Sequence, residues 1–394
     1  MKKKIALIAV NSLLLIALAA ALIASGMIRG TLRSQQAASA FSGESGESFA
    51  QLSAFFSEDS GFDENSIMSI RDAVEKALSD AAIDDESDEN DGGGTNDEGG
   101  EGGRVLYTDA WSAWGEVSLR SSLGSAQAKA CAVGGDFFLF HPLYLRDGSY
   151  LSPDDLMKDR IVLDEELAWR LFGSVQLEGL EVMIGDKPFI IAGVVSREDD
   201  FASGKAYTDG AGLFMSIEAL RELTEDTVHI TSYELVMSDP ITGFALKTLT
   251  DALPIADAVI VENSRRYTLE STFKNIGEFG ERSIHADGMI YPYWENAARY
   301  TEDWLALLLV LTLLVALCPG VCAVIYGVKL IRFGIGRGKR ALAKKIDKRE
   351  DIKAQEYCLE HEEEYTSHDI ADIVREFLEE NARSEEETVP KENK

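Results

Sequence analysis

The sequence predicts a mixed α/β (α+β) fold, in which a two-lobed extracytoplasmic domain lies between two transmembrane helices. Two apolar stretches, 5–28 and 304–328, are each long enough to span a bilayer. Between them, strand–helix units occur early, at 49–82, and late, at 231–253, which indicates one lobe built from both ends of the segment. The block between these units, about 136–225, has a different pattern and is expected to form an inserted second lobe.

The first apolar stretch follows a short cytoplasmic N-terminus, residues 1–4. Residues 5–28 contain no charged side chain and would form about 36 Å of helix at about 1.5 Å per residue. A cleaved signal peptide is the alternative, with a weak cleavage site at Ala38-Ser39-Ala40. Apolar regions of signal peptides usually run about 7–15 residues, so the length favours an uncleaved membrane anchor.

The second stretch, 304–328, ends at an abrupt change of composition. Ten Lys or Arg and three Asp or Glu follow in 329–353, and such a basic block marks the cytoplasmic side of a span. Three N-terminal lysines mark the same side, so we expect a membrane protein with both termini cytoplasmic and residues 29–303 outside. Aromatic residues gather at the outer end of this stretch, as at a membrane interface: Tyr291, Tyr293, Trp294, Tyr300 and Trp304.

The charge of the chain lies outside the membrane. The formal net charge is -30, and the three N-terminal lysines (+3) balance the residues after the second span (-3), so the outer segment carries all of it. This acidity argues against nucleic acid as a partner, because nothing would neutralise the phosphates. Only four cysteines are present, and only Cys131 is in the outer segment, which excludes a disulfide-stapled scaffold.

The early unit begins with an alternating segment. Residues 49–56 (FAQLSAFF) predict a half-buried strand whose polar side carries Gln51 and Ser53. A helix follows, with cap candidates at 63–66. Its apolar stripe consists of Ile67, Ile70, Val74, Leu78 and Ala81.

Residues 84–103 (DDESDENDGGGTNDEGGEGG) have almost no apolar side chain. Such a segment buries too little surface to offset its ordering entropy, so we expect a disordered acidic, glycine-rich loop. A calcium site is the alternative, but the spacing matches no EF-hand loop, and a solvated linker is favoured.

The late unit combines a strand at 233–237 with a helix that Asp239 would cap, with Pro240 at its first position. The expected buried face of this helix is Ile241, Phe244, Ala245, Leu249 and Leu253. A further strand is expected over 126–133, before the apolar run FFLFHPLYL.

The middle block combines a strand, a helix and a hairpin. The strand over 161–163 leads into a helix that Asp164 caps and Gly173 ends. A hairpin follows, with its turn at Gly185-Asp186. Its first arm is the alternating set Leu180, Val182 and Ile184, and its second arm is 189–195.

This order of elements resembles the MacB-type periplasmic core domain of the MacB/FtsX-like ABC transporter permease family. The family pattern is V-L-x-E-x-x-A-x-x-L-F-G, then L-G-x-x-I, then G-x-x-x-x-I-x-G-V-V. The matching residues are Val162 to Gly173, Leu177-Glu178-Gly179, Gly185 and Ile191 to Val195, preceded by the phenylalanine-rich FFLFHPLYLRDGSYL. The resemblance covers about residues 40–300 and is strongest at 136–196.

The resemblance implies a porter-like α/β lobe with an inserted strand–helix–hairpin lobe. It also implies a permease-like protein whose non-catalytic outer domain serves an ABC-type export or mechanotransmission complex. The implied partners are an ABC ATPase, multi-span permease subunits, an extracytoplasmic protein or peptide ligand, and a second copy of the chain. Relatives carry four spans, and the last two are missing from this pattern. A stand-alone membrane-anchored sensor or scaffold, binding a ligand without transport, is therefore the alternative.

Catalytic motifs do not emerge from the sequence. No G-x-x-x-x-G-K-[ST], H-E-x-x-H or paired C-x-x-C occurs, so no catalytic, cofactor-binding or metal-binding residue and no cofactor is predicted. Ser271-Thr272-Phe273-Lys274 fits S-x-x-K but lacks an accompanying K-T-G, which favours an ordinary surface helix. An ectoenzyme is the least supported hypothesis. Cys358, His361 and His368 match no metal-site spacing and are interpreted as solvated helix residues.

The cytoplasmic tail, 329–394, begins with the basic juxtamembrane patch, which would meet anionic membrane lipid. An amphipathic helix is expected over 367–380. It would either pack on its own chain or another copy, or dock into a groove on a partner such as an ATPase. Its apolar stripe is Ile370, Ile373, Val374, Phe377 and Leu378.

Overall fold

The computed structural model forms two compact units. They are Ile16–Leu314, and Met1–Leu15 together with Val315–Lys394. Helices α1 (Lys2–Thr31) and α10 (Tyr293–Glu360) contribute to both. The structure describes residues 2–43, 48–88, 106–206, 212–224, 227–253, 255, 257–278, 285–286, 289–360 and 371–380.

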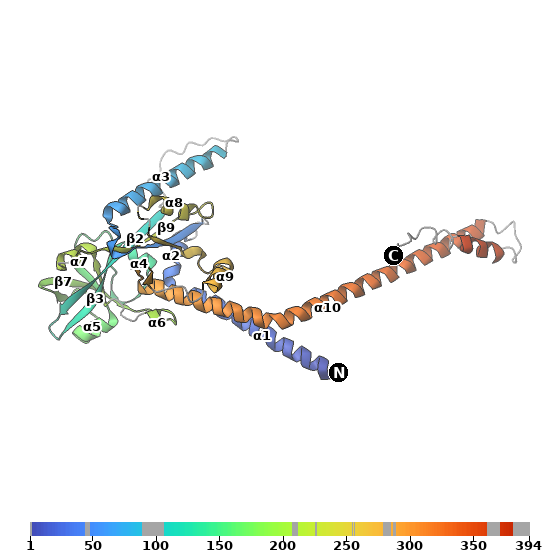
Figure 1. The fold of residues 1–394 in the computed structure, drawn as a ribbon, viewed down its shortest axis with the longest axis horizontal. Helices are drawn as coiled ribbons and strands as arrows, with labels where there is room; N and C mark the ends of the chain where they lie inside the picture. The colour runs from blue at the N-terminus through green and yellow to red at the C-terminus, as the bar shows by residue number, and fades with distance from the viewer. Residues whose placement is uncertain are drawn as a thin grey trace. The chain divides into compact units, whose positions relative to one another are not determined.

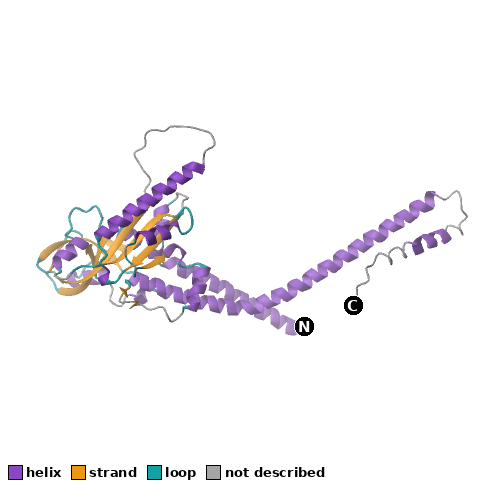
Figure 2. Cartoon of the chain, turned by 45° about the horizontal axis from the view of Figure 1, so that its top comes forward, coloured by secondary structure: helices purple, strands orange, loops and turns teal. Residues whose placement is uncertain are grey.

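The folded part between the two apolar helices, here called the core domain, is built on one ten-stranded sheet (Figures 1 and 2). Its order is β10-β1-β9-β2-β3-β8-β5-β7-β4, with β6 beside β2 and β7. The pairs β3–β8 and β5–β7 are parallel and the others antiparallel. The strands are β1 (Phe49–Phe55), β2 (Tyr107–Arg120), β3 (Ser125–Gly135), β4 (Tyr144–Gly148), β5 (Arg160–Asp164), β6 (Glu181–Ile184), β7 (Lys187–Ser196), β8 (Leu213–Ser216), β9 (Ile230–Ser238) and β10 (Val259–Glu262).

The early and late segments meet in one half of this sheet, because β9 lies between β1 and β2. The block 136–225 supplies β4 to β8, which form the other half. The long hairpin of β2 and β3 joins the two halves, because β2 pairs with β9 and β3 pairs with β8. The sheet therefore continues from one half to the other without a break. The predicted mixed α/β fold is confirmed. The boundaries of the two expected lobes stay a prediction.

Both faces of the central strands are buried. On one face, α3 (Glu64–Asp88) and α8 (Phe244–Ala252) cover β1 and β9, and their apolar residues share a core with Leu52 and Tyr233 (Figure 1). On the opposite face, the residues that follow α1 and those that begin α10 pack over Phe137 and Phe140. The prediction of a half-buried β1 was therefore wrong. The polar side of this strand is covered by the segments that connect to the membrane helices.

The other helices and short elements are η1 (Arg33–Gln35), α2 (Ala37–Ser42), η2 (Glu58–Ser60), α4 (Phe137–Phe140), α5 (Glu165–Phe172), α6 (Ser203–Ala206), α7 (Ile217–Leu223), η3 (Asn263–Arg265), α9 (Leu269–Gly277), β11 (His285–Ala286) and β12 (Met289–Ile290). Several of these helices pack on the strands, with α2 against β1 and β9, α4 against β2, and α5 and α7 against β3.

Two predicted helix boundaries of the middle block agree with the structure. The Asp164 carboxylate accepts the backbone N–H of Leu167 at 2.6 Å, which caps α5. The helix ends at Gly173, which adopts a left-handed conformation (φ 65°). The β6–β7 hairpin also forms as expected, but Leu180 lies just outside β6 and is 47% exposed.

The helix after β9 begins later than predicted. It starts at Phe244 with Gly243 as its cap residue, so Pro240 precedes the helix and Ile241 is 75% exposed. Asp239 still binds the N-terminus of this helix, because its carboxylate accepts the N–H of Ala245 at 3.0 Å. The left-handed Gly243 (φ 88°) lets the chain turn before the first helical residue.

The acidic loop prediction is partly wrong. Helix α3 continues to Asp88, so 84–88 are helical. The rest of the predicted loop, 89–103, lies outside the described residues. The early part of α3 begins as expected, with the Asp63 carboxylate accepting the N–H of Ser66 at 2.9 Å.

Helices α1 and α10 each contain an apolar stretch long enough to cross a membrane. Helix α10 includes the expected second span, continues through Pro319 and contains the basic segment 329–353. The tail helix is described over 371–380, and Phe377 stacks on Tyr357 of α10 with ring centroids 6.0 Å apart. This contact favours packing on the same chain over a free docking helix. The first predicted residues, 367–370, lie outside the described residues.

Gly193 tests the packing of β7 against β4. It is the glycine of the I-x-G-V-V run and pairs with Gly148. A Cβ at Gly193 would lie 2.5 Å from the backbone oxygen of Ser149 and 2.8 Å from that of Asp147. We expect Gly193→Ala to lower the free energy of unfolding by about 1–3 kcal/mol, as overpacking does.

The measurement is urea unfolding of the full chain in detergent, with tryptophan fluorescence as the signal that reports unfolding. The control is Gly204→Ala, because a Cβ at Gly204 meets no atom within 4 Å. Equal stability of the two variants would contradict the packing argument.

Candidate functional site

The candidate site is the junction at which the core domain holds the segments next to the two membrane helices. Gln51 on β1 binds the segment that follows α1: its amide nitrogen donates to the Ser34 carbonyl at 2.7 Å and its amide oxygen accepts the Ala37 N–H at 2.9 Å. Gln51 is fully buried, so both halves of its amide are paired. Leu32, which follows α1 directly, is also buried. The polar side of β1 therefore fixes the exit of α1.

Arg266 fixes α10. Its guanidinium donates two hydrogen bonds to the Glu295 carboxylate, at 2.6 and 2.7 Å, and one from Nε to Glu302 at 2.7 Å. The side chain of Arg266 is 2% exposed, and those of Glu295 and Glu302 are 1% and 7% exposed. Glu295 and Glu302 are seven residues apart, which places both on one face of α10. A buried, bidentate arginine–carboxylate pair thus joins the core domain to this helix.

Pairing between opposite charges keeps the buried Glu295 and Arg266 side chains ionised. Burial raises the pKa of Glu295, but Arg266 and Arg299 outweigh burial and hold that pKa below its ordinary value. Arg299 donates to the same carboxylate at 2.6 Å. Burial lowers the pKa of Arg266, whereas Glu295 raises it, and the net direction is upward. Arg266 and Glu295 are therefore both charged at neutral pH.

The network continues from Arg266 into the sheet. Arg266 donates to the Asn263 amide oxygen at 3.3 Å, and Asn263 donates to Ser53 on β1 at 2.7 Å. Ser53 donates to Glu234 on β9 at 2.9 Å, and the other oxygen of Glu234 bonds the His141 ring after α4. An unbroken line of buried polar groups thus connects α10, two central strands and α4.

An aromatic contact holds α10 beside this line. Trp294 is 2% exposed and lies 4.2 Å, centroid to centroid, from the ring of His141. Phe137 and Trp114 contact the same indole at 5.6 and 5.9 Å. A large buried aromatic side chain contributes apolar burial that the ion pairs do not supply. The beginning of α10 is therefore bound both by charge and by packing.

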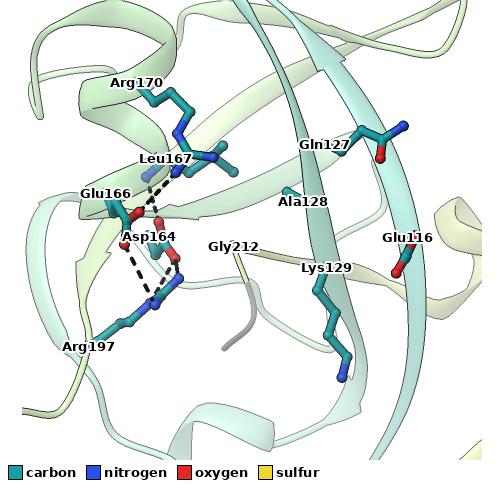
Figure 3. A pocket seen from close by; sticks show the side chains of 10 residues that line it. All are labelled: Glu116, Gln127, Ala128, Lys129, Asp164, Glu166, Leu167, Arg170, Arg197 and Gly212. Carbon is teal, nitrogen blue, oxygen red and sulfur yellow. Dashed lines mark hydrogen bonds and ion pairs between the residues drawn. The ribbon is translucent and has the colours of Figure 1, made fainter. Parts of the chain in front are cut away.

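A polar cavity of about 540 Å³ opens between β3 and α5 in the other half of the sheet (Figure 3). Arg197 reaches Asp164 with its Nε at 2.9 Å, and Arg170 donates to Glu166 at 2.9 Å. Burial raises the pKa of Asp164, although Arg197 acts against this. Most of the described residues that line the cavity are charged, so it offers groups that could bind a polar ligand.

The serine and the lysine of the S-x-x-K pattern make local contacts at α9. The Ser271 hydroxyl donates to the Arg265 carbonyl at 3.0 Å, and Lys274 pairs with Glu278 at 3.8 Å. The S-x-x-K residues therefore serve the start and end of α9. Within the described residues there is no cluster of three or more metal-ligating groups. His361 and His368, and the side chain of Cys358, lie outside what the structure describes.

The family of the chain follows from sequence comparison. The sequence model of one protein family, the MacB-like periplasmic core domain, matches residues 15–253. The chain belongs to this family, whose members are permease components of ABC transporters, and the predicted resemblance is confirmed. Its two apolar helices are consistent with a membrane protein. No curated protein matches the chain.

Two solved structures are similar to the chain. The periplasmic region of MacB from Actinobacillus actinomycetemcomitans is 20% identical, with a TM-score of 0.37, and the match covers 57% of this chain and 92% of that one. The extracellular domain of the noncanonical ABC-type transporter YknZ from Gram-positive bacteria is 14% identical, with a TM-score of 0.31, and the match covers 40% of this chain and 81% of that one.

Removal of Arg266 tests the ion cluster. Arg266→Met leaves Glu295 and Glu302 buried without their main partner, and breaking such a pair costs about 3–5 kcal/mol. We expect a loss of this size in the free energy of unfolding of the full chain, measured by urea titration in detergent.

Arg265→Met is the matched control. Arg265 is half exposed and pairs with Glu262 only at 4.0 Å, so its loss should cost no more than about 1 kcal/mol. Similar effects of the two neighbouring substitutions would contradict the role assigned to Arg266.

The pH dependence tests Glu295. Its folded-state pKa is lowered, so its contribution to stability is fully present above the unfolded-state value, about 4.3, and is lost as the pH falls through the folded-state pKa. We expect the unfolding free energy of the full chain to fall below about pH 4.5.

Glu295→Gln should lower stability at pH 7 and flatten the acid limb of this profile, whereas Glu270→Gln on the exposed surface of α9 should leave the profile unchanged. A wild-type acid limb in Glu295→Gln would mean that other carboxylates carry it.

Proposed function

We propose that this chain is a permease-like subunit of an ABC-type export or mechanotransmission complex, in which the core domain moves together with its membrane helices. The buried Arg266 cluster carries this proposal. Paired charges that are costly to separate tie α10 to Arg266. Hydrogen bonds through Asn263 and Ser53 then connect Arg266 to β1 and β9. A displacement of this part of α10 would therefore displace the sheet and not merely bend a linker.

The exit of α1 supports the same proposal. Gln51 binds the segment after α1, and Ser53, two residues further along the same strand, belongs to the line that reaches Arg266. One strand thus bonds to the exit of one membrane helix and, through its neighbours, to the other. A lateral shift between the two helices would be transmitted to β1.

In this proposal the core domain lies outside the cell and both termini are cytoplasmic. The domain is non-catalytic and binds an extracytoplasmic protein or peptide. An ABC ATPase supplies the motion from the cytoplasmic side, and further spans come from a multi-span permease or a second copy. The charged cavity beside α5 is the candidate contact for the extracytoplasmic ligand. The alternative is a stand-alone anchored sensor or scaffold, which would use the same cavity without nucleotide-driven movement.

Purification from native membranes in mild detergent tests the proposal. We expect mass spectrometry to identify an ATP-binding cassette protein with the wild-type chain. The rate at which a protease cleaves the core domain should then change when ATP is added, because the domain moves together with the membrane helices.

The same change should persist in Arg265→Met and be lost in Arg266→Met, while the ATPase still co-purifies. Absence of any ATPase or permease under several detergent conditions, with ligand binding that ignores nucleotide, would contradict the proposal and favour the sensor.

A further inference from the structure

Three aromatic side chains gather at the end of the α10 apolar stretch that is nearest the core domain. Tyr300 and Trp304 are one helical turn apart on α10, with ring centroids 6.3 Å apart. Phe201, from the connection between β7 and β8, packs against both, at 5.4 Å from Tyr300 and 5.5 Å from Trp304. A turn of the core domain that is distant in sequence therefore meets the first residue of the apolar stretch.

The turn that carries Phe201 is fixed in place. The Asp200 carboxylate accepts the N–H groups of Ala202 at 3.0 Å and Ser203 at 3.1 Å. Ala202 is 3% exposed and packs with Leu32, which follows α1, and with Ala297 and Ala298 on α10. Phe201 itself is 59% exposed, and Trp304 is 40% exposed. The aromatic ring thus projects outward from a buried, hydrogen-bonded base.

The residues that contact the Phe201 turn indicate how deep it lies relative to the membrane. Trp304 begins the apolar stretch 304–328, and tryptophan at such a position lies at the boundary between headgroups and acyl chains. Leu32 follows the other apolar helix and packs beneath the same turn. Because Phe201 contacts Trp304 directly, it reaches the same depth. An exposed phenylalanine at that depth gains by burying its ring among acyl chains.

We propose that the Phe201 turn inserts into the lipid interface and forms a membrane contact of the core domain separate from its two helices. The flanking charges are mixed, with Asp199 and Asp200 on one side and Lys205 on the other. The contact therefore depends on the apolar boundary of the bilayer and does not require anionic headgroups. It fixes the half of the sheet that contains β7 and β8 to the membrane surface, so this half has a support of its own when the helices move.

Photo-cross-linking of the full chain in lipid nanodiscs tests the proposal. Phe201 is replaced by p-benzoylphenylalanine, a photoreactive derivative of phenylalanine, in nanodiscs of phosphatidylcholine alone and of phosphatidylcholine with phosphatidylglycerol. We expect intact-mass spectrometry to detect a covalent lipid adduct in both compositions, with similar yield.

Two positions serve as controls. The same residue at Leu313, 49% exposed within the apolar stretch, should give adducts. At Tyr144, 61% exposed on the edge strand β4, it should give none. The proposal is overturned if position 201 gives no lipid adduct while position 313 does, if position 144 reacts as well as 201, or if position 201 cross-links to protein in place of lipid. These outcomes do not depend on any ATPase, so failure here is distinct from failure of the proposed function.

Discussion

The architecture depends on one constraint: a buried guanidinium must keep its carboxylate partners. Arg266 is surrounded by protein, and removal of either side of the pair would leave an uncompensated charge inside the domain. The first turns of α10 therefore cannot leave the sheet without a large cost. The apolar contact of Trp294 with His141 acts in the same direction without using charge.

This constraint gives the core domain a particular mechanical character. Ordinary connections between domains are exposed, and relative motion is their default behaviour. Here the segments beside both apolar helices bond to buried polar groups of β1 or its neighbours. A permease component that has to transmit movement would benefit from such a junction, whereas a passive anchor would need only a tether.

The local elements of the family-like block were predictable because short-range signals define them. Asp164 and Gly173 bracket α5, and the Gly185-Asp186 turn sets the β6–β7 hairpin. Gly193 shows why the I-x-G-V-V run needs its glycine, because the backbone around Ser149 occupies the space of a side chain. Local chemistry also misled once: Asp239 and Pro240 look like a helix start, but Gly243 allows a turn before α8.

The junction was not predictable in the same way. Gln51 and Ser53 read as the solvent side of a strand, because alternation cannot show what covers the polar face. Arg266 and Glu295 are 29 residues apart, and charged residues are usually exposed. One signal was present: Glu295, Arg299 and Glu302 share a helix face next to alanines and tryptophans, which is unusual for a solvated surface.

Hydrogen exchange of the full chain in lipid nanodiscs tests the central claim most directly. The exchange rates of the backbone amides of 296–303 are compared with the rates in β1 and β9 and with the rates in the C-terminal turns of α3. If the ion cluster makes the start of α10 part of the core domain, its amides should exchange nearly as slowly as those of the two central strands. Exchange as fast as in the C-terminal turns of α3 would show that α10 separates readily from the sheet, and would contradict the account.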